Sequence, residues 1–183
     1  MNPFKRIAIA VLSAFGLAVH AQTESPQKSG ADVMRELRLR ALSAPAEHFG
    51  ISPSRDFPRT YAVLIDFPIN DQTATIVSFS DGSSSLYTTS TFGIIGGGAH
   101  EKVKLASQRL IVAADEFFER AEPTEEYPYP GKGKVCFYLV TFQGVRVLET
   151  ALSDIESAQS ELSSLFWAGQ EVLTQLRLST EKR

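Results

Sequence analysis

One segment limits the possible folds of this chain more than any other: YAVLIDF, residues 61–67. Both alternating sets of side chains in this segment are largely apolar, which is the pattern of a strand covered on both faces. Such a strand lies inside a sheet, and that sheet must carry packed layers on its two sides. We therefore predict a central strand here, with helices packed on the faces of its sheet.

The other expected strands come in two groups with short connections. Asn70-Asp71, Asp81-Gly82 and Gln143-Gly144 are typical hairpin turns. Parallel strands need helical crossovers, and neither group contains one. The sequence therefore predicts one antiparallel five-stranded sheet. The expected strands are residues 61–67, 73–79, 85–91, 134–142 and 145–150.

Apolar residues repeat at helical spacing in residues 31–43, 100–119 and 160–178. Ser160 can cap the last of these helices. In the first helix we expect Arg35, Arg38 and Arg40 on the solvent-exposed side. The predicted class is α+β with the order α-β-β-β-α-β-β-α.

The N-terminus has the pattern of a secretory signal peptide. Lys5 and Arg6 precede an apolar run at residues 7–19, and small residues lead to a cleavage site after Ala21. We expect export, to the periplasm or the medium, with a signal peptide at 1–21, a flexible leader at 22–30, a domain at 31–178 and a polar tail at 179–183. Met34 as an alternative start remains open.

The charge balance bears on partners. Without Lys5 and Arg6 the chain has 16 basic and 21 acidic residues, a net charge near −5. Nucleic acids and anionic membranes attract basic surfaces, so we expect neither as a partner. A membrane-spanning helix needs about 20 apolar residues, more than residues 7–19 supply, so we expect no stable membrane anchor. Cys136 is the only cysteine, and its apolar neighbours indicate a buried, inert thiol.

The stretch FGIIGGGAHEKV, residues 92–103, contains four glycines within seven residues. Gly93 and Gly98 have the spacing of a phosphate-binding P-loop, but Ala99 and His100 stand where that loop needs Lys and Ser or Thr. No register gives the dinucleotide fingerprint either. Two interpretations remain. The stretch is a turn that needs positive φ and close packing before a helix, or it is an anion site. The anion site would comprise Gly96, Gly97, Gly98, His100 and Lys102.

Catalytic components are few. After cleavage the histidines are His48 and His100, in different segments, so we expect no metal site and no cofactor. The serines at 83–85 can converge on His100, but no G-x-S-x-G motif marks a nucleophile. Trp167 is the better candidate for an interface, because aromatic residues dominate binding hot spots and Phe166 belongs to the apolar stripe. We favour a non-enzymatic function and leave catalysis open.

Residues 78–103 and 165–178, including the stretch GIIGGGAH, resemble small bacterial proteins without a characterised activity. The predicted element order is similar to roadblock and profilin-like folds, whose members often act as dimerising scaffolds or partner-binding modules. These resemblances imply a stand-alone binding or scaffold domain, of an adaptor or immunity-like kind, that meets a protein partner or a second copy. The alternative is an anion-binding protein or hydrolase centred on Gly96 to His100.

Overall fold

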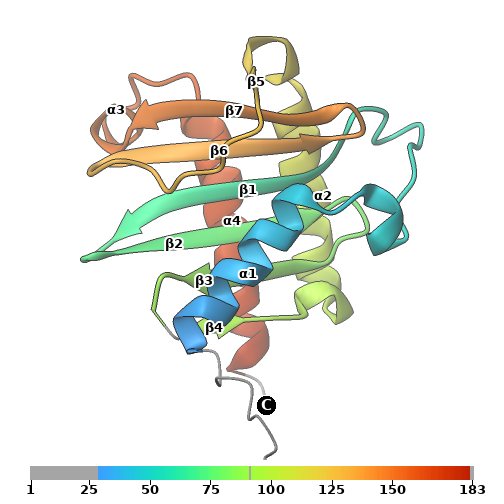
Figure 1. Ribbon diagram of the computed structural model, residues 1–183, viewed down its shortest axis with the longest axis horizontal. Coiled ribbons are helices and arrows are strands. Elements are labelled where there is room, and N and C mark those ends of the chain that lie inside the picture. Colours follow the sequence, from blue (N-terminus) through green and yellow to red (C-terminus); the bar gives the residue numbers. More distant parts are fainter. Residues whose placement is uncertain (1–28, 91, 182–183) are drawn as a thin grey trace, which may run out of the picture.

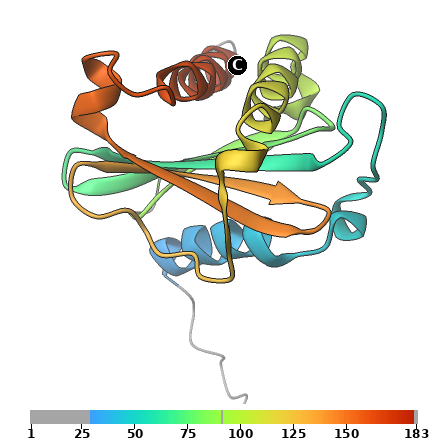
Figure 2. The same cartoon turned by 90° about the horizontal axis from the view of Figure 1, so that it is seen from above.

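The computed structural model describes residues 29–90 and 92–181. A seven-stranded antiparallel sheet forms the middle layer. Helix α1 (Gly30–Ser43) covers one face, and helices α2 (Glu101–Asp115) and α4 (Ser163–Thr180) lie side by side on the other (Figures 1 and 2). The α+β class with helices on the sheet faces is confirmed. The predicted signal peptide, residues 1–21, lies outside the described residues.

The strand order in the sheet is β4-β3-β2-β1-β6-β7-β5, so YAVLIDF is central within β1. Every neighbouring pair is antiparallel. The bounds are β1 (Thr60–Ile69), β2 (Gln72–Phe79), β3 (Ser84–Thr88), β4 (Gly93–Ile94), β5 (Glu122–Thr124), β6 (Lys134–Thr141) and β7 (Gly144–Ala151).

The prediction of five strands was wrong, and so was the predicted order of elements. The observed order is α-β-β-β-β-α-β-β-β-α-α, because β4 and β5 extend the two edges of the sheet and a short helix α3 (Leu152–Glu156) precedes α4. The two edge strands have two and three residues, too few to show an alternating pattern. Pro123 in β5 also removes a backbone donor, which is acceptable only at an edge.

The end of α2 and the start of α4 differ from the predicted helix bounds. Ser29 caps α1, with its hydroxyl accepting a hydrogen bond from the Asp32 amide at 3.2 Å. Ser160 accepts a hydrogen bond from the Leu162 amide at 3.2 Å, but α4 itself begins at Ser163. Helix α2 ends at Asp115, and a 3-10 helix (Phe118–Arg120) follows. Within the described ranges, none of the helices has the length and apolar character needed to cross a membrane.

The larger core lies between the sheet and the pair α2 and α4. Val63 and Ile65 of β1 are fully buried there, as are Leu110 of α2 and Leu165 of α4. Gly169 allows α4 to approach the sheet closely, because a Cβ at this position would lie 2.4 Å from Cδ1 of Ile65. Phe166 is buried in the same core, as the sequence predicts.

The smaller core lies under α1, and it contains charged residues. Arg38 is buried, with 1% of its surface exposed, so its expected exposure was wrong. It points into the sheet because Asp66 of β1 provides a buried anionic partner. Arg35 and Arg40 are exposed, as predicted. Cys136 of β6 is buried beside Asp66 in the strand register, which confirms the expected burial of the thiol.

Candidate functional site

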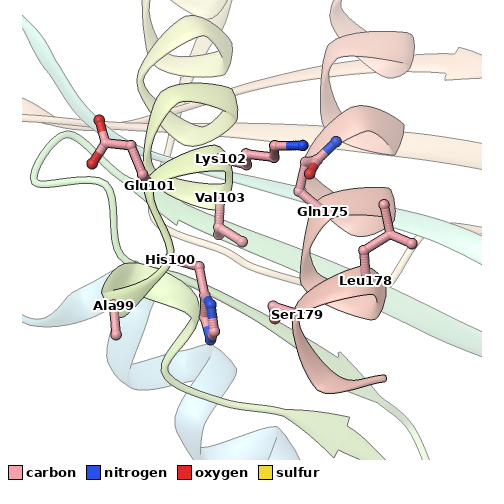
Figure 3. Close-up of a pocket in the computed structure, with 8 residues that line it drawn as sticks. All are labelled: Ala99, His100, Glu101, Lys102, Val103, Gln175, Leu178 and Ser179. Atoms are coloured by element: carbon pink, nitrogen blue, oxygen red, sulfur yellow. The ribbon is translucent and has the colours of Figure 1, made fainter. Parts of the chain in front are cut away.

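A pocket of about 290 Å³ lies between the start of α2 and the end of α4. His100 at the N-cap of α2 and Lys102 in α2 line it on one side, and α4 contributes Gln175 and Ser179 (Figure 3). The imidazole of His100 lies on the side of Ser179, while the side chain of Lys102 extends toward Gln175. Glu101 points away from this space. The fold thus brings His100 and Lys102 of the predicted anion site to one pocket.

The three central glycines of the stretch have backbone roles in the described structure. Gly96 has φ +85°, a conformation that glycine adopts at little cost. Gly97 is buried, and a Cβ there would lie 2.4 Å from Cδ2 of Leu176. A Cβ on Gly98 would lie 3.1 Å from Cα of Ser83. None of the three is among the residues that line the pocket. The positive φ of Gly96 and the close packing at Gly97 and Gly98 therefore account for the three glycines.

The pocket lining includes Lys102 and one serine, Ser179, whose hydroxyl donates to the carbonyl of Leu176 at 2.7 Å. His100 occupies the N-cap of α2, where no side chain of the described residues caps the helix. Its backbone amide donates to the carbonyl of Gly97 at 3.1 Å. The hydroxyl of Ser83 donates to Asp81 at 2.7 Å, and that of Ser84 pairs with Ser78 at 3.1 Å. The hydroxyls of Ser83 and Ser84 are thus engaged away from His100.

The other components of a catalytic site lie elsewhere. His48 belongs to the 3-10 helix Ala46–Phe49, which follows α1. In residues 29–90 and 92–181, no three histidine, cysteine or acidic side chains gather in a way that would hold a metal ion. The described geometry therefore places a pocket at His100 to which His48 does not contribute.

Trp167 lies on α4 with 56% of its surface exposed. Its ring makes an edge contact with buried Phe166, with centroids 5.3 Å apart, and this contact holds the indole in place. Leu178 on α4 and Leu105 and Val112 on α2 are also 44–51% exposed. We call the four residues Leu105, Val112, Trp167 and Leu178 the outer helical face. It lies on the layer formed by α2 and α4.

Comparisons with protein-family models, curated proteins and solved structures find no match for the chain. We therefore infer function from the geometry of the described residues.

A buried polar cluster under α1 was missed by the sequence analysis. Nε of Arg38 donates to both carboxylate oxygens of Asp66, and Nη1 donates to the carbonyl of Tyr127 at 2.9 Å. The hydroxyl of Thr75 also donates to Asp66, at 2.5 Å. The Arg38 guanidinium lies 4.3 Å from the ring centroid of Tyr129. With side chains 2% and 0% exposed, Arg38 and Asp66 tie α1, β1 and the loop after β5 together and are inaccessible to a substrate.

The electrostatics of this cluster follow from burial and pairing. Burial raises the pKa of Asp66, while hydrogen bonds from Arg38 and Thr75 oppose that rise. Burial alone would lower the pKa of Arg38, but its contacts with Asp66 raise it instead. The sequence did contain a signal for the pair. Arg38 is four residues from both Met34 and Leu42, on the apolar side of the helix, and Asp66 interrupts an apolar strand.

Proposed function

We propose that this protein is an exported, non-enzymatic binding module that docks a protein partner, or a second copy of itself, through its outer helical face. The observation that carries the proposal is Trp167, a large aromatic side chain more than half exposed on a rigid helix. Tryptophan is among the residues that most often dominate the binding energy of interfaces.

The neighbours of Trp167 support an interface rather than an isolated exposed side chain. Trp167 and Leu178 are separated by about 16 Å along α4, from a rise of 1.5 Å per residue. Leu105 and Val112 are separated by about 10 Å along α2 on the same basis. Because the two helices lie side by side (Figure 2), these residues spread apolar surface over both of them. Helices held by a buried core present such a surface with little loss of conformational freedom on binding.

Exposed charged residues lie near the outer helical face and can form the rim of an interface there. Arg109 of α2, Glu116 just after α2 and Glu171 of α4 are exposed, and polar or charged rims surround the apolar centres of protein interfaces. The expected acidic balance of the exported chain disfavours a nucleic acid or an anionic membrane on this surface. A protein partner is therefore the better match, as an adaptor or immunity-like function would require.

Native mass spectrometry of tagged protein purified from its own host tests this proposal. We expect a mass that begins at Gln22, together with a second polypeptide or as twice the monomer. Trp167→Ala should abolish the complex, because it removes the largest apolar side chain of the outer helical face. Leu39→Ala is the matched control, since Leu39 is 38% exposed on α1, on the opposite face of the sheet. A lone monomer for the unsubstituted chain, or equal loss in both variants, contradicts the proposal.

A second candidate function, binding of a small anion, is favoured by one specific observation: His100 and Lys102 line the same pocket (Figure 3). We expect phosphate to raise the melting temperature of the wild-type chain if this pocket binds anions. His100→Ala should abolish that rise, and His48→Ala, in another segment, should retain it. The same rise in both variants excludes the pocket as the binding site.

A further inference from the structure

A second pocket, of about 270 Å³, lies on the sheet-facing side of α4 near the β4 edge. Its buried lining comes from Phe67 of β1, Ala74 of β2 and Leu86 of β3, each at most 7% exposed. Leu173 of α4 and the exposed Ile69 and Phe92 complete its apolar lining. This pocket does not involve the outer helical face, so it is independent of the function proposed above.

Two polar residues belong to this lining, Thr88 and Arg177, and Arg177 is exposed on α4. The hydroxyl of Thr88 is already engaged, because it lies 2.8 Å from the carbonyl oxygen of Phe92 and 2.8 Å from the hydroxyl of Ser90. Arg177 is different. In the part of the chain that the structure describes, its guanidinium makes no ion pair, whereas Arg38, Arg59 and Arg120 each pair with an acidic side chain.

An apolar pocket that carries one unpaired cation selects for an amphiphilic anion. The apolar lining favours a hydrocarbon tail, because burying apolar surface is favourable in proportion to its area. The planar guanidinium matches a carboxylate in two parallel hydrogen bonds. At about 30 Å³ per heavy atom, the share of a water molecule in the liquid, the pocket holds about nine heavy atoms.

From this combination we infer that the pocket binds an aliphatic monocarboxylate of about six to eight carbons, with its tail between α4 and the sheet and its carboxylate on Arg177. The size and the single cation exclude a larger polyanion as the preferred ligand. The site is a small-molecule site on the sheet side of α4.

Titration with octanoate, followed by NMR of the methyl groups of Ala74, Leu86 and Leu173, tests the inference. These methyl signals should shift and saturate. Octanol, which keeps the tail but lacks the charge, should bind about tenfold more weakly, as should octanoate to Arg177→Gln, because a hydrogen bond to a charged group is lost in each case. From butyrate to octanoate, each added methylene should tighten binding by about two- to fourfold.

Two control variants separate the charge of Arg177 from general effects. Arg177→Lys keeps the positive charge but loses the planar pair of donors, so its affinity for octanoate should lie between those of the unsubstituted chain and Arg177→Gln. Arg109→Gln removes an exposed arginine from α2 and should bind octanoate as the unsubstituted chain does. The inference is overturned if octanol binds as tightly as octanoate, if Arg177→Gln leaves octanoate binding unchanged, or if the three methyl groups do not respond to octanoate.

Discussion

Arg38 and Asp66 join helix α1 to the central strand β1 through a buried ion pair, with Nε of Arg38 3.0 Å from Oδ2 and 3.2 Å from Oδ1 of Asp66. The two residues are 28 positions apart in the chain. The same guanidinium donates to the backbone carbonyls of Tyr127 and Pro128, so the loop after β5 is held to α1 as well. One buried side chain therefore connects three segments on this face of the sheet.

We expect Asp66→Asn to lower the free energy of unfolding by about 3 kcal/mol, because it leaves the buried charge of Arg38 without an anion. Urea denaturation at neutral pH measures this loss. Arg40→Met is the matched control, since Arg40 is exposed on the same helix, and its effect should stay within about 0.5 kcal/mol. A loss below about 1 kcal/mol for Asp66→Asn would show that the pair contributes little.

Cys136 should be almost unreactive in the folded protein. Burial and a hydrogen bond to Glu149 raise the pKa of its thiol to about 12. Because only the thiolate attacks disulfide reagents, the reactive fraction at pH 8 is roughly 1,000-fold smaller than for a thiol of pKa about 9. Labelling with a chromogenic disulfide should therefore be slow in buffer and fast in denaturing urea. Equal rates in the two conditions would contradict the described burial.

The apolar pattern of YAVLIDF was sufficient to predict the layers of the fold. A strand that is apolar on both sides can be satisfied only by packing on both faces, and β1 is indeed central with helices on either side. The edge strands β4 and β5 could not be predicted from an apolar pattern. Gly93–Ile94 and Glu122–Thr124 become strands through pairing with β3 and β7, which is a tertiary effect with no periodic signal of its own.

Of the predicted anion site, His100 and Lys102 line the candidate pocket, whereas Gly96, Gly97 and Gly98 do not. His100 and Lys102 reach the same pocket because the glycine turn leads directly into α2. Their neighbours Gln175 and Ser179 come from α4, some 75 residues later in the chain, and no local pattern indicates that contact. The apolar pocket at Arg177 was missed for the same reason, because its lining is assembled from three strands, a loop and a helix.

Gly97→Ala should destabilise the fold by about 1–3 kcal/mol, because the added methyl overlaps with packed side chains. Its Cβ would lie 2.4 Å from Cδ2 of Leu176 and 2.9 Å from Cγ1 of Val103. Gly131→Ala is the matched control, since the nearest atom to its Cβ would be Cδ of Lys134 at 3.8 Å. Thermal unfolding compares the two variants. If the Gly97→Ala chain were as stable as the control, α4 would have moved to make room for the methyl group without a loss of stability.

Gln170→Met should raise the free energy of unfolding by about 1 kcal/mol. In the described residues, Nε2 of Gln170 is buried without a hydrogen-bond partner. Removing such a group from water costs free energy, and no hydrogen bond in the folded state compensates for it. Methionine keeps the length and flexibility of the side chain while removing the polar atoms. For a domain of this size the melting temperature should rise by about 2–4 °C. Gln175→Met is the control on the same helix, because Nε2 of Gln175 donates to Glu171 at 2.8 Å on the exposed side and its replacement should have little effect. A fall in stability for Gln170→Met, with Gln175→Met unchanged, would show that the amide of Gln170 is bonded in solution.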